Sequence, residues 1–82
     1  MSSDAPRLHD LRLGEGGFAF DPRTGDSYTV SATGVEIIGW LREGRDAADI
    51  AARLCTRYGI GPQAARRDVD EFLAALRGWR LL

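Results

Sequence analysis

The stretch that decides the fold is FDPRTGDSYTVSATG, residues 20–34, because it joins a β-hairpin to the start of a helix. Its first part predicts a turn, since Pro22 fixes one backbone angle and Gly25 readily accepts a left-handed conformation. Residues 27–30, Ser-Tyr-Thr-Val, are then expected to form a strand that returns beside the segment before the turn. The stretch therefore predicts an antiparallel strand pair that leads directly into helical structure.

Two expected strands involve the residues before this turn. Residues 7–13 alternate loosely between apolar and polar side chains, as a half-buried strand does. Residues 18–20, Phe-Ala-Phe, alternate again, and the glycine-rich residues 14–17 between the two segments predict a turn. Together with residues 27–30, these segments predict three short strands joined in sequence order, which is a β-meander.

Three helices are expected after the strands. Thr33 and Glu36 have the spacing of a capping box, which predicts the start of the first helix. Asp46 is expected to cap the second helix, and Pro62 suits the first position of the third, where no backbone N–H is needed. Each helix has a glycine as its expected stop signal, and these are Gly44, Gly59 and Gly78.

The order of these elements predicts an α+β fold of the winged-helix-like kind, a three-stranded antiparallel β-meander followed by three α-helices. The expected domain spans residues 7–82, and the small, polar residues 1–6 are expected to be a disordered terminus. The apolar faces of the strands and helices predict the core. Its expected members are Leu11, Leu13, Phe18, Phe20, Val35, Ile38, Leu41, Ile50, Leu54, Val69, Phe72 and Leu76.

The bulk composition excludes several classes of protein. A chain of 82 residues is expected to be one domain, and 44% hydrophobic residues suffice to order all of it. The formal net charge of −1 offers no excess of positive charge for binding a phosphate backbone. The first residues show neither a basic region nor an apolar run, so we expect no signal peptide, no membrane partner and a cytoplasmic location.

No group of residues predicts catalysis. His9 has no Ser, Cys or second His at ligand spacing, and Cys55 is the only cysteine and belongs to no motif. Residues 14–17 resemble a phosphate-binding loop in composition only, because they join two strands and open no helix. We therefore expect no enzyme activity, no metal and no cofactor.

The third strand differs from the first in how its edge is protected. In a meander both outer strands are edges, which proteins usually guard with charge or proline. The first strand carries charged side chains, whereas residues 27–30 carry none. An unguarded edge suits the addition of a peptide strand, but so short an edge can also need no guard, or the C-terminal tail can cover it. The strand residues that would bind a peptide are Ser27, Tyr28, Thr29 and Val30.

Motifs spread along the chain give a second indication. Residues 20–25 read aromatic-Asp-Pro-x-Thr-Gly, residues 31–34 read polar-x-Thr-Gly, residues 50–51 are Ile-Ala, and residues 68–73 hold Asp-Val followed by Phe-Leu. In this order and spacing, over roughly residues 8–82, the sequence resembles the PqqD-like proteins. The resemblance depends on the order and spacing of these motifs, because no single motif is specific.

The resemblance implies a peptide chaperone without chemistry of its own, of the kind that recognises ribosomally made, modified peptides. Such proteins bind the leader of a precursor peptide as an added strand beside the third strand and against the third helix, and present it to a modifying enzyme. The resemblance extends to a branch associated with HPr-kinase-like partners. Two departures are Ser31, at the cap of the first helix, where the family often has Asn, and Trp79-Arg80, which separate Gly78 from the final leucines. Ser and Asn both cap helices well.

The third helix offers two flanks to such a peptide. We expect contact from the flank that joins the buried stripe to an exposed polar pair, because an apolar surface with a polar rim is typical of peptide grooves. The residues of this flank are Arg66, Val69, Asp70 and Leu73. The opposite flank, which is less apolar, holds Ala64, Asp68, Glu71 and Ala75.

Two other functions fit the same elements. A winged-helix protein would place its third helix in the DNA major groove, where Gln63, Arg66 and Arg67 would meet the duplex. Three acidic residues follow between positions 68 and 71 and would repel the phosphate backbone, so we expect no nucleic-acid partner. The other alternative is a structural subunit that docks on an enzyme and binds no peptide.

Overall fold

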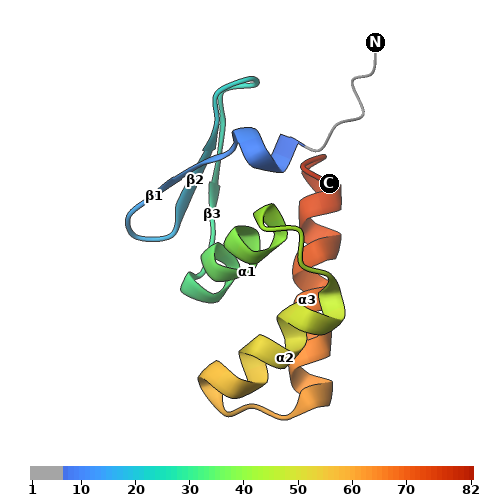
Figure 1. Ribbon diagram of the computed structural model, residues 1–82. Helices are drawn as coiled ribbons and strands as arrows, with labels where there is room; N and C mark the ends of the chain where they lie inside the picture. Colours follow the sequence, from blue (N-terminus) through green and yellow to red (C-terminus); the bar gives the residue numbers. More distant parts are fainter. Residues whose placement is uncertain (1–6) are drawn as a thin grey trace.

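The computed structural model describes residues 7–82, and the expectation of disorder for residues 1–6 lies outside this range. A short 3₁₀-helix, three strands and three α-helices follow one another along the chain (Figure 1). They are η1 (Arg7–Asp10), β1 (Arg12–Gly14), β2 (Phe18–Asp21), β3 (Asp26–Thr29), α1 (Ala32–Arg42), α2 (Ala47–Tyr58) and α3 (Pro62–Gly78). The expected order of three strands followed by three α-helices is confirmed.

The three strands form an antiparallel sheet in the order β1-β2-β3, so the expected meander is also confirmed. In its register, Ala19 of β2 lies opposite Leu13 of β1 and opposite Tyr28 of β3. The sheet stands beside the helices, and α2 and α3 pack against each other (Figure 1). Within residues 7–82, no helix combines the length and the apolar character that crossing a bilayer requires.

The expected strand over residues 7–13 is wrong in its first half, where the chain forms η1 before β1 begins. Leu8 and Leu11 both point into the core, with 2% and 3% of their surface exposed. A spacing of three residues puts two side chains on one face of a 3₁₀-helix but on opposite faces of a strand. The Arg42 guanidinium donates to the carbonyl oxygens of Leu8 and Leu11, which ties η1 to α1.

The ends of α2 and the start of α3 follow the expected signals. The Asp46 carboxylate accepts a hydrogen bond from the Asp49 backbone N–H at 2.8 Å and so caps α2. Gly59 ends α2 in the left-handed conformation, with φ of 67°, which glycine adopts without steric cost. Pro62 is the first residue of α3. At these three positions the local sequence signals agree with the observed bounds.

The start of α1 differs from the capping-box prediction. The Ser31 hydroxyl accepts a hydrogen bond from the Gly34 backbone N–H at 3.0 Å, so Ser31 is the N-cap, at the position that the family resemblance marks. The capping box of Thr33 and Glu36 is wrong, because Thr33 already lies within the helix. Glu36 instead forms an ion pair with Arg57, which fastens α1 to α2.

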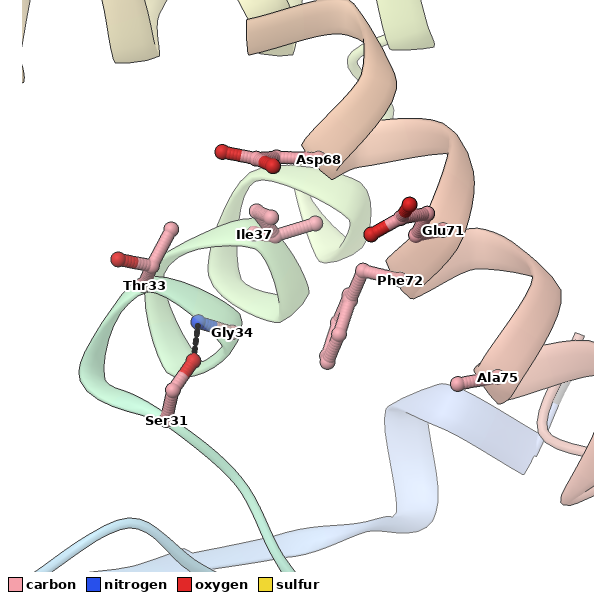
Figure 2. Close-up of a pocket in the computed structure, with 8 residues that line it drawn as sticks. All are labelled: Ser31, Thr33, Gly34, Ile37, Asp68, Glu71, Phe72 and Ala75. Atoms are coloured by element: carbon pink, nitrogen blue, oxygen red, sulfur yellow. Dashed lines mark hydrogen bonds between the residues drawn. The ribbon is translucent and has the colours of Figure 1, made fainter. Parts of the chain in front are cut away.

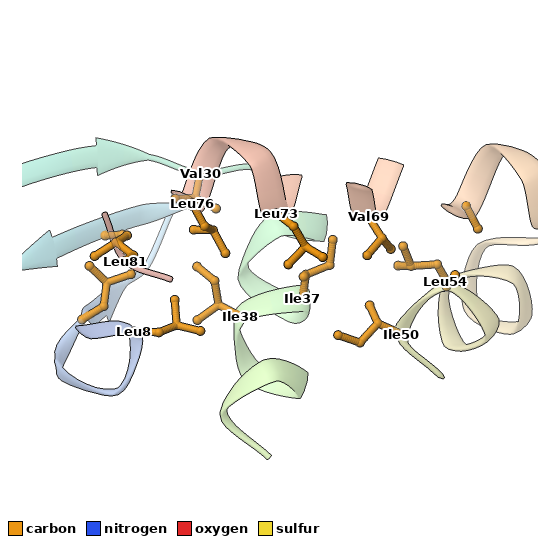
Figure 3. Close-up of a cluster of buried hydrophobic side chains, with 14 residues drawn as sticks. Leu8, Val30, Ile37, Ile38, Ile50, Leu54, Val69, Leu73, Leu76 and Leu81 are labelled. Atoms are coloured by element: carbon orange, nitrogen blue, oxygen red, sulfur yellow. The ribbon is translucent and has the colours of Figure 1, made fainter. Parts of the chain in front are cut away.

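The buried core lies between the sheet, η1 and the three helices (Figure 3). The expected members that are buried are Leu11, Ile38, Ile50, Leu54, Val69 and Leu76. The expected members that are half-buried and pack against its edge are Leu13, Val35, Leu41 and Phe72. The other buried residues lie outside this expected list, although Ala65 and Leu73 belong to the apolar face expected of the third helix and Ile37 to that of the first. They are Leu8, Ala19, Val30, Ile37, Ala51, Ala65, Leu73 and Leu81.

Phe18 and Phe20 are the expected core residues that lie on the solvent side of the sheet, with 50% and 36% of their surface exposed. Ala19 between them is fully buried, so β2 turns its other face inward. Ala19 lies opposite Tyr28, whose ring stacks on Trp79 after the end of α3. Both rings are half-buried and pack against the core.

Candidate functional site

The outer edge of β3 has two backbone positions that point away from the sheet. The Val30 N–H donates to the Gly17 carbonyl oxygen at 2.6 Å, so these residues are a hydrogen-bonded pair at the end of the β2–β3 ladder. Because antiparallel pairs alternate, Tyr28 also bonds toward β2, whereas the N–H and C=O groups of Ser27 and Thr29 point outward. Within residues 7–82, no strand pairs with this edge.

The four residues expected to form the strand site differ in what they expose, and Val30 lies just after β3, which ends at Thr29. The side chains of Ser27 and Thr29 are exposed, that of Tyr28 is half-buried, and Val30 is a core residue with 4% of its surface exposed. The edge therefore offers backbone groups at Ser27 and Thr29 and an aromatic surface at Tyr28. Contact of these residues with a peptide stays a prediction.

A hollow of about 420 Å³ opens between the start of α1 and the middle of α3, directly after β3 in the sequence (Figure 2). It belongs to the size range of small ligand pockets. Its lining residues are Ser31, Thr33, Gly34, Ile37, Asp68, Glu71, Phe72 and Ala75. The hollow thus lies where the end of the open strand edge meets two helices.

The floor of the hollow is set by a close approach of α1 to α3. The Phe72 ring extends from α3 toward Gly34 in the first turn of α1 (Figure 2). A Cβ atom placed on Gly34 would lie 2.8 Å from Cε1 of Phe72 and 2.5 Å from Cγ1 of Val30. A residue without a side chain is therefore needed at position 34 for the ring to lie against the helix.

The rim of the hollow is acidic. The carboxylates of Asp68 and Glu71 both extend from α3 over the space beside Ile37 and Phe72 (Figure 2). Neither forms an ion pair with any residue in the described range, and no Arg lines the hollow. The main chemical feature of this surface is an apolar floor edged by two carboxylates that form no ion pair within residues 7–82.

Tyr28 and Trp79 lie along the same side of α3 as the hollow. The two rings stack with their centroids 4.4 Å apart and their planes inclined by 23°. Trp79 follows Ala75 by one helical turn, and its backbone N–H donates to the Ala75 carbonyl at 2.9 Å. The C-terminal part of α3 therefore runs beside β3, from Phe72 near Gly34 to Trp79 against Tyr28. In the sequence Trp79 is a departure from the family pattern, which did not indicate this role.

The flank of α3 that the sequence analysis favoured lies away from the hollow. Val69 is fully buried and Leu73 has 8% of its surface exposed, so both side chains belong to the core. Arg66 and Asp70 are exposed and form an ion pair with each other at 3.1 Å. The opposite flank of α3 lines the hollow. Contact of these four residues with a peptide stays a prediction.

Other candidate groups do not assemble into a site. Among residues 7–82, no three His, Cys, Asp or Glu side chains come close enough together to hold a metal ion. His9 is exposed near β1, far along the chain from Cys55, which is half-buried in α2. The open edge of β3 and the hollow beside it together form the candidate site.

The fold and site define a small α+β domain of the winged-helix-like kind, with an exposed strand edge beside a helix-lined hollow. Residues 16–82 match the family model described as coenzyme PQQ synthesis protein D (PqqD), and the chain belongs to this family. The resemblance seen in the sequence is thereby confirmed for these residues. No curated protein matches the chain in sequence.

One solved structure has a similar fold. It is described as lasso peptide synthetase B1 complexed with the leader peptide. It is 24% identical in sequence, with a TM-score of 0.76, and the match covers 85% of this chain and 84% of that chain. The likeness extends over most of both chains, so it shows that the two proteins share a fold.

Proposed function

We propose that this protein binds the leader segment of a ribosomally made precursor peptide and presents it to a modifying enzyme, without catalysing a reaction itself. The observation that carries this proposal is the outward-facing backbone of Ser27 and Thr29 beside a helix-lined hollow. Membership of the PqqD family supports it, as does the likeness to a synthetase subunit whose structure includes a leader peptide.

The proposed complex adds the peptide to β3 as a fourth strand. The N–H and C=O groups of Ser27 and Thr29 would hydrogen-bond to the peptide backbone, which provides affinity for any sequence. Side chains of a strand alternate between two faces, so every second peptide residue would face the helices. Those residues would meet Tyr28, Trp79 and the hollow, which provide the selectivity.

The remaining peptide residues would face the solvent side of the sheet, where Phe18 and Phe20 are exposed. A peptide held in this way stays accessible along one face and at both ends, as presentation to an enzyme requires. The partner enzyme is proposed to be a peptide-modifying enzyme or an HPr-kinase-like protein, and the proposed location is the cytoplasm.

DNA binding has less support from the charges of α3. Arg66, one of the cations at the start of this helix, is paired with Asp70. The acidic pair Asp68 and Glu71 follows on the side of α1. A duplex lying along α3 would meet these negative charges within one turn of its proposed contacts.

Amide hydrogen exchange on the isolated protein tests the proposal. The leader segment of the partner precursor peptide should slow exchange at Ser27 and Thr29, whose N–H groups face outward in the free protein. Tyr28 and Val30, which already bond toward β2, serve as internal controls and should change little. If duplex DNA protects Gln63 and Arg67 while the peptide protects no amide of β3, the proposed function is wrong.

A further inference from the structure

The hollow beside β3 has two different surfaces that lie within the reach of one side chain. The Phe72 ring and Ile37 form an apolar floor, and the carboxylates of Asp68 and Glu71 stand above it (Figure 2). Long cationic side chains place their methylene groups on apolar surface and keep the charged end in a polar environment. A cation can in addition lie over the face of an aromatic ring. The hollow thus matches a side chain with an apolar stem and a positive end.

The two carboxylates of this rim are not neutralised by ion pairs within the described part of the chain. Asp70 on the same helix is paired with Arg66, and Glu36 on α1 is paired with Arg57. Asp68 and Glu71 have no such partner among residues 7–82. The N-terminus of α1 supplies the equivalent of about half a positive charge, which two carboxylates exceed. The hollow therefore keeps a net negative character.

We propose that this hollow is a subsite for a Lys or Arg side chain of the bound peptide. The inference rests on the proposed function, since the side chain enters from a strand added to β3. Asp68 and Glu71 accept hydrogen bonds from the cation, and its stem lies across Phe72 and Ile37. A metal ion is a poor fit, because hard cations such as Ca²⁺ take about six to eight oxygen ligands.

The position of the hollow also indicates which part of the bound peptide carries the Lys or Arg. Ser31, at one wall of the hollow, comes two residues after the last residue of β3, whereas the Tyr28–Trp79 stack lies beside the strand itself. The cationic residue is therefore in the part of the peptide that passes the Thr29 end of β3. Peptide residues beside Asp26 and Ser27 lie farther from Asp68 and Glu71, so this subsite does not select them.

Selection from a phage-displayed library of random peptides on the immobilised protein tests the subsite. Selected peptides should share a Lys or Arg at one position. A synthetic copy of a selected peptide with norleucine at that position should bind about tenfold more weakly. Asp68→Asn combined with Glu71→Gln should weaken binding of the Lys peptide by a similar factor and leave the norleucine peptide unaffected, as in a double-mutant cycle.

Asp70→Asn is the matched control, because it removes a carboxylate from the same helix outside the hollow. It should leave the affinity for the Lys peptide unchanged, and circular dichroism should show that both variants fold. If the double variant binds the Lys peptide as tightly as the wild type, the subsite is wrong and the proposed function stands. If the wild-type protein selects no peptide, the proposed function fails and the subsite fails with it.

Discussion

The ring of Tyr28 in β3 stacks on the indole of Trp79, which follows α3, with the ring centroids 4.4 Å apart. The stack joins the strand with the open edge to the helix that forms one wall of the hollow. The chain continues past it through Arg80, which has a positive φ of 61°, to the fully buried Leu81. The C-terminal residues thereby connect the end of α3 to β3 and to the core.

A double-mutant cycle should detect this stack. Trp79→Leu and Tyr28→Leu keep apolar volume but remove the ring pair, and such pairs contribute about 0.5–1.5 kcal/mol beyond the area they bury. The two single substitutions should therefore destabilise the protein by more, in sum, than the double substitution does, by about that amount. Urea unfolding followed by circular dichroism gives the unfolding free energy of the wild type, of each single variant and of the double variant. Effects that simply add would show that the two rings do not stabilise each other.

The two exposed phenylalanines of β2 give a second prediction. Because Phe18 is 50% exposed on the solvent face, Phe18→Thr should lower the unfolding free energy by less than about 1 kcal/mol. Leu54 is fully buried, so Leu54→Ala should cost about 2–5 kcal/mol. Urea unfolding of both variants makes the comparison. A larger loss for Phe18→Thr than for Leu54→Ala would mean that β2 turns Phe18 inward after all.

These residues also show where sequence reasoning succeeds and where it fails. Helix bounds depend on local signals, so Asp46, Gly59 and Pro62 could be predicted from their neighbours alone. The alternation of residues 18–20 predicts that the two phenyl rings share a face, but it does not say which face is buried. That choice depends on Tyr28 and on a tail residue far along the chain.

In the candidate site, too, one feature could be predicted from the sequence and another depended on tertiary packing. The open edge of β3 could be predicted, because strand order and the absence of charge over residues 27–30 are visible in the sequence. The strand itself begins one residue earlier, at the charged Asp26. The flank of α3 that faces the hollow could not, since Asp68 and Asp70 lie on either side of the same buried stripe and only the tertiary packing decides which side meets α1. The structure places Asp68 at the rim and leaves Asp70 outside the hollow.

Gly34 and Gly39 in α1 form a matched pair for a third prediction. Replacing glycine by alanine within a helix stabilises it by about 0.5–1 kcal/mol where space permits. At Gly39 no atom lies within 4 Å of the added methyl group, so Gly39→Ala should stabilise the protein by about this amount. At Gly34 the methyl group would meet Phe72 and Val30 at 2.8 and 2.5 Å, and overpacking of this kind costs about 1–3 kcal/mol.

Gly34→Ala should therefore destabilise the protein, although both substitutions improve helix propensity equally. Thermal or urea unfolding of the two variants gives the sign of each effect. The displaced Phe72 ring should also alter the floor of the hollow, so the variant should bind the leader peptide more weakly at temperatures where it remains folded. Equal stabilisation by both alanines would contradict the close contact between α1 and α3.

The sharpest test of strand addition is a proline at Thr29. The Thr29 N–H points away from β2, so a proline there leaves the β2–β3 ladder intact and deletes a donor from the open edge. The variant should fold, as judged by circular dichroism and urea unfolding. Its affinity for the leader peptide should fall by about tenfold or more, which corresponds to about 1.4 kcal/mol.

Two controls separate the loss of a donor from other effects of the substitution. Thr29→Ala keeps the backbone N–H and removes the exposed side chain, so it should bind the peptide nearly as well as the wild type. Tyr28→Pro deletes an N–H that faces β2, so it should destabilise the fold itself, unlike Thr29→Pro. Calorimetric titration of the folded variants gives the affinities. If Thr29→Pro folds and retains wild-type affinity, the peptide does not pair with β3, whatever else it contacts.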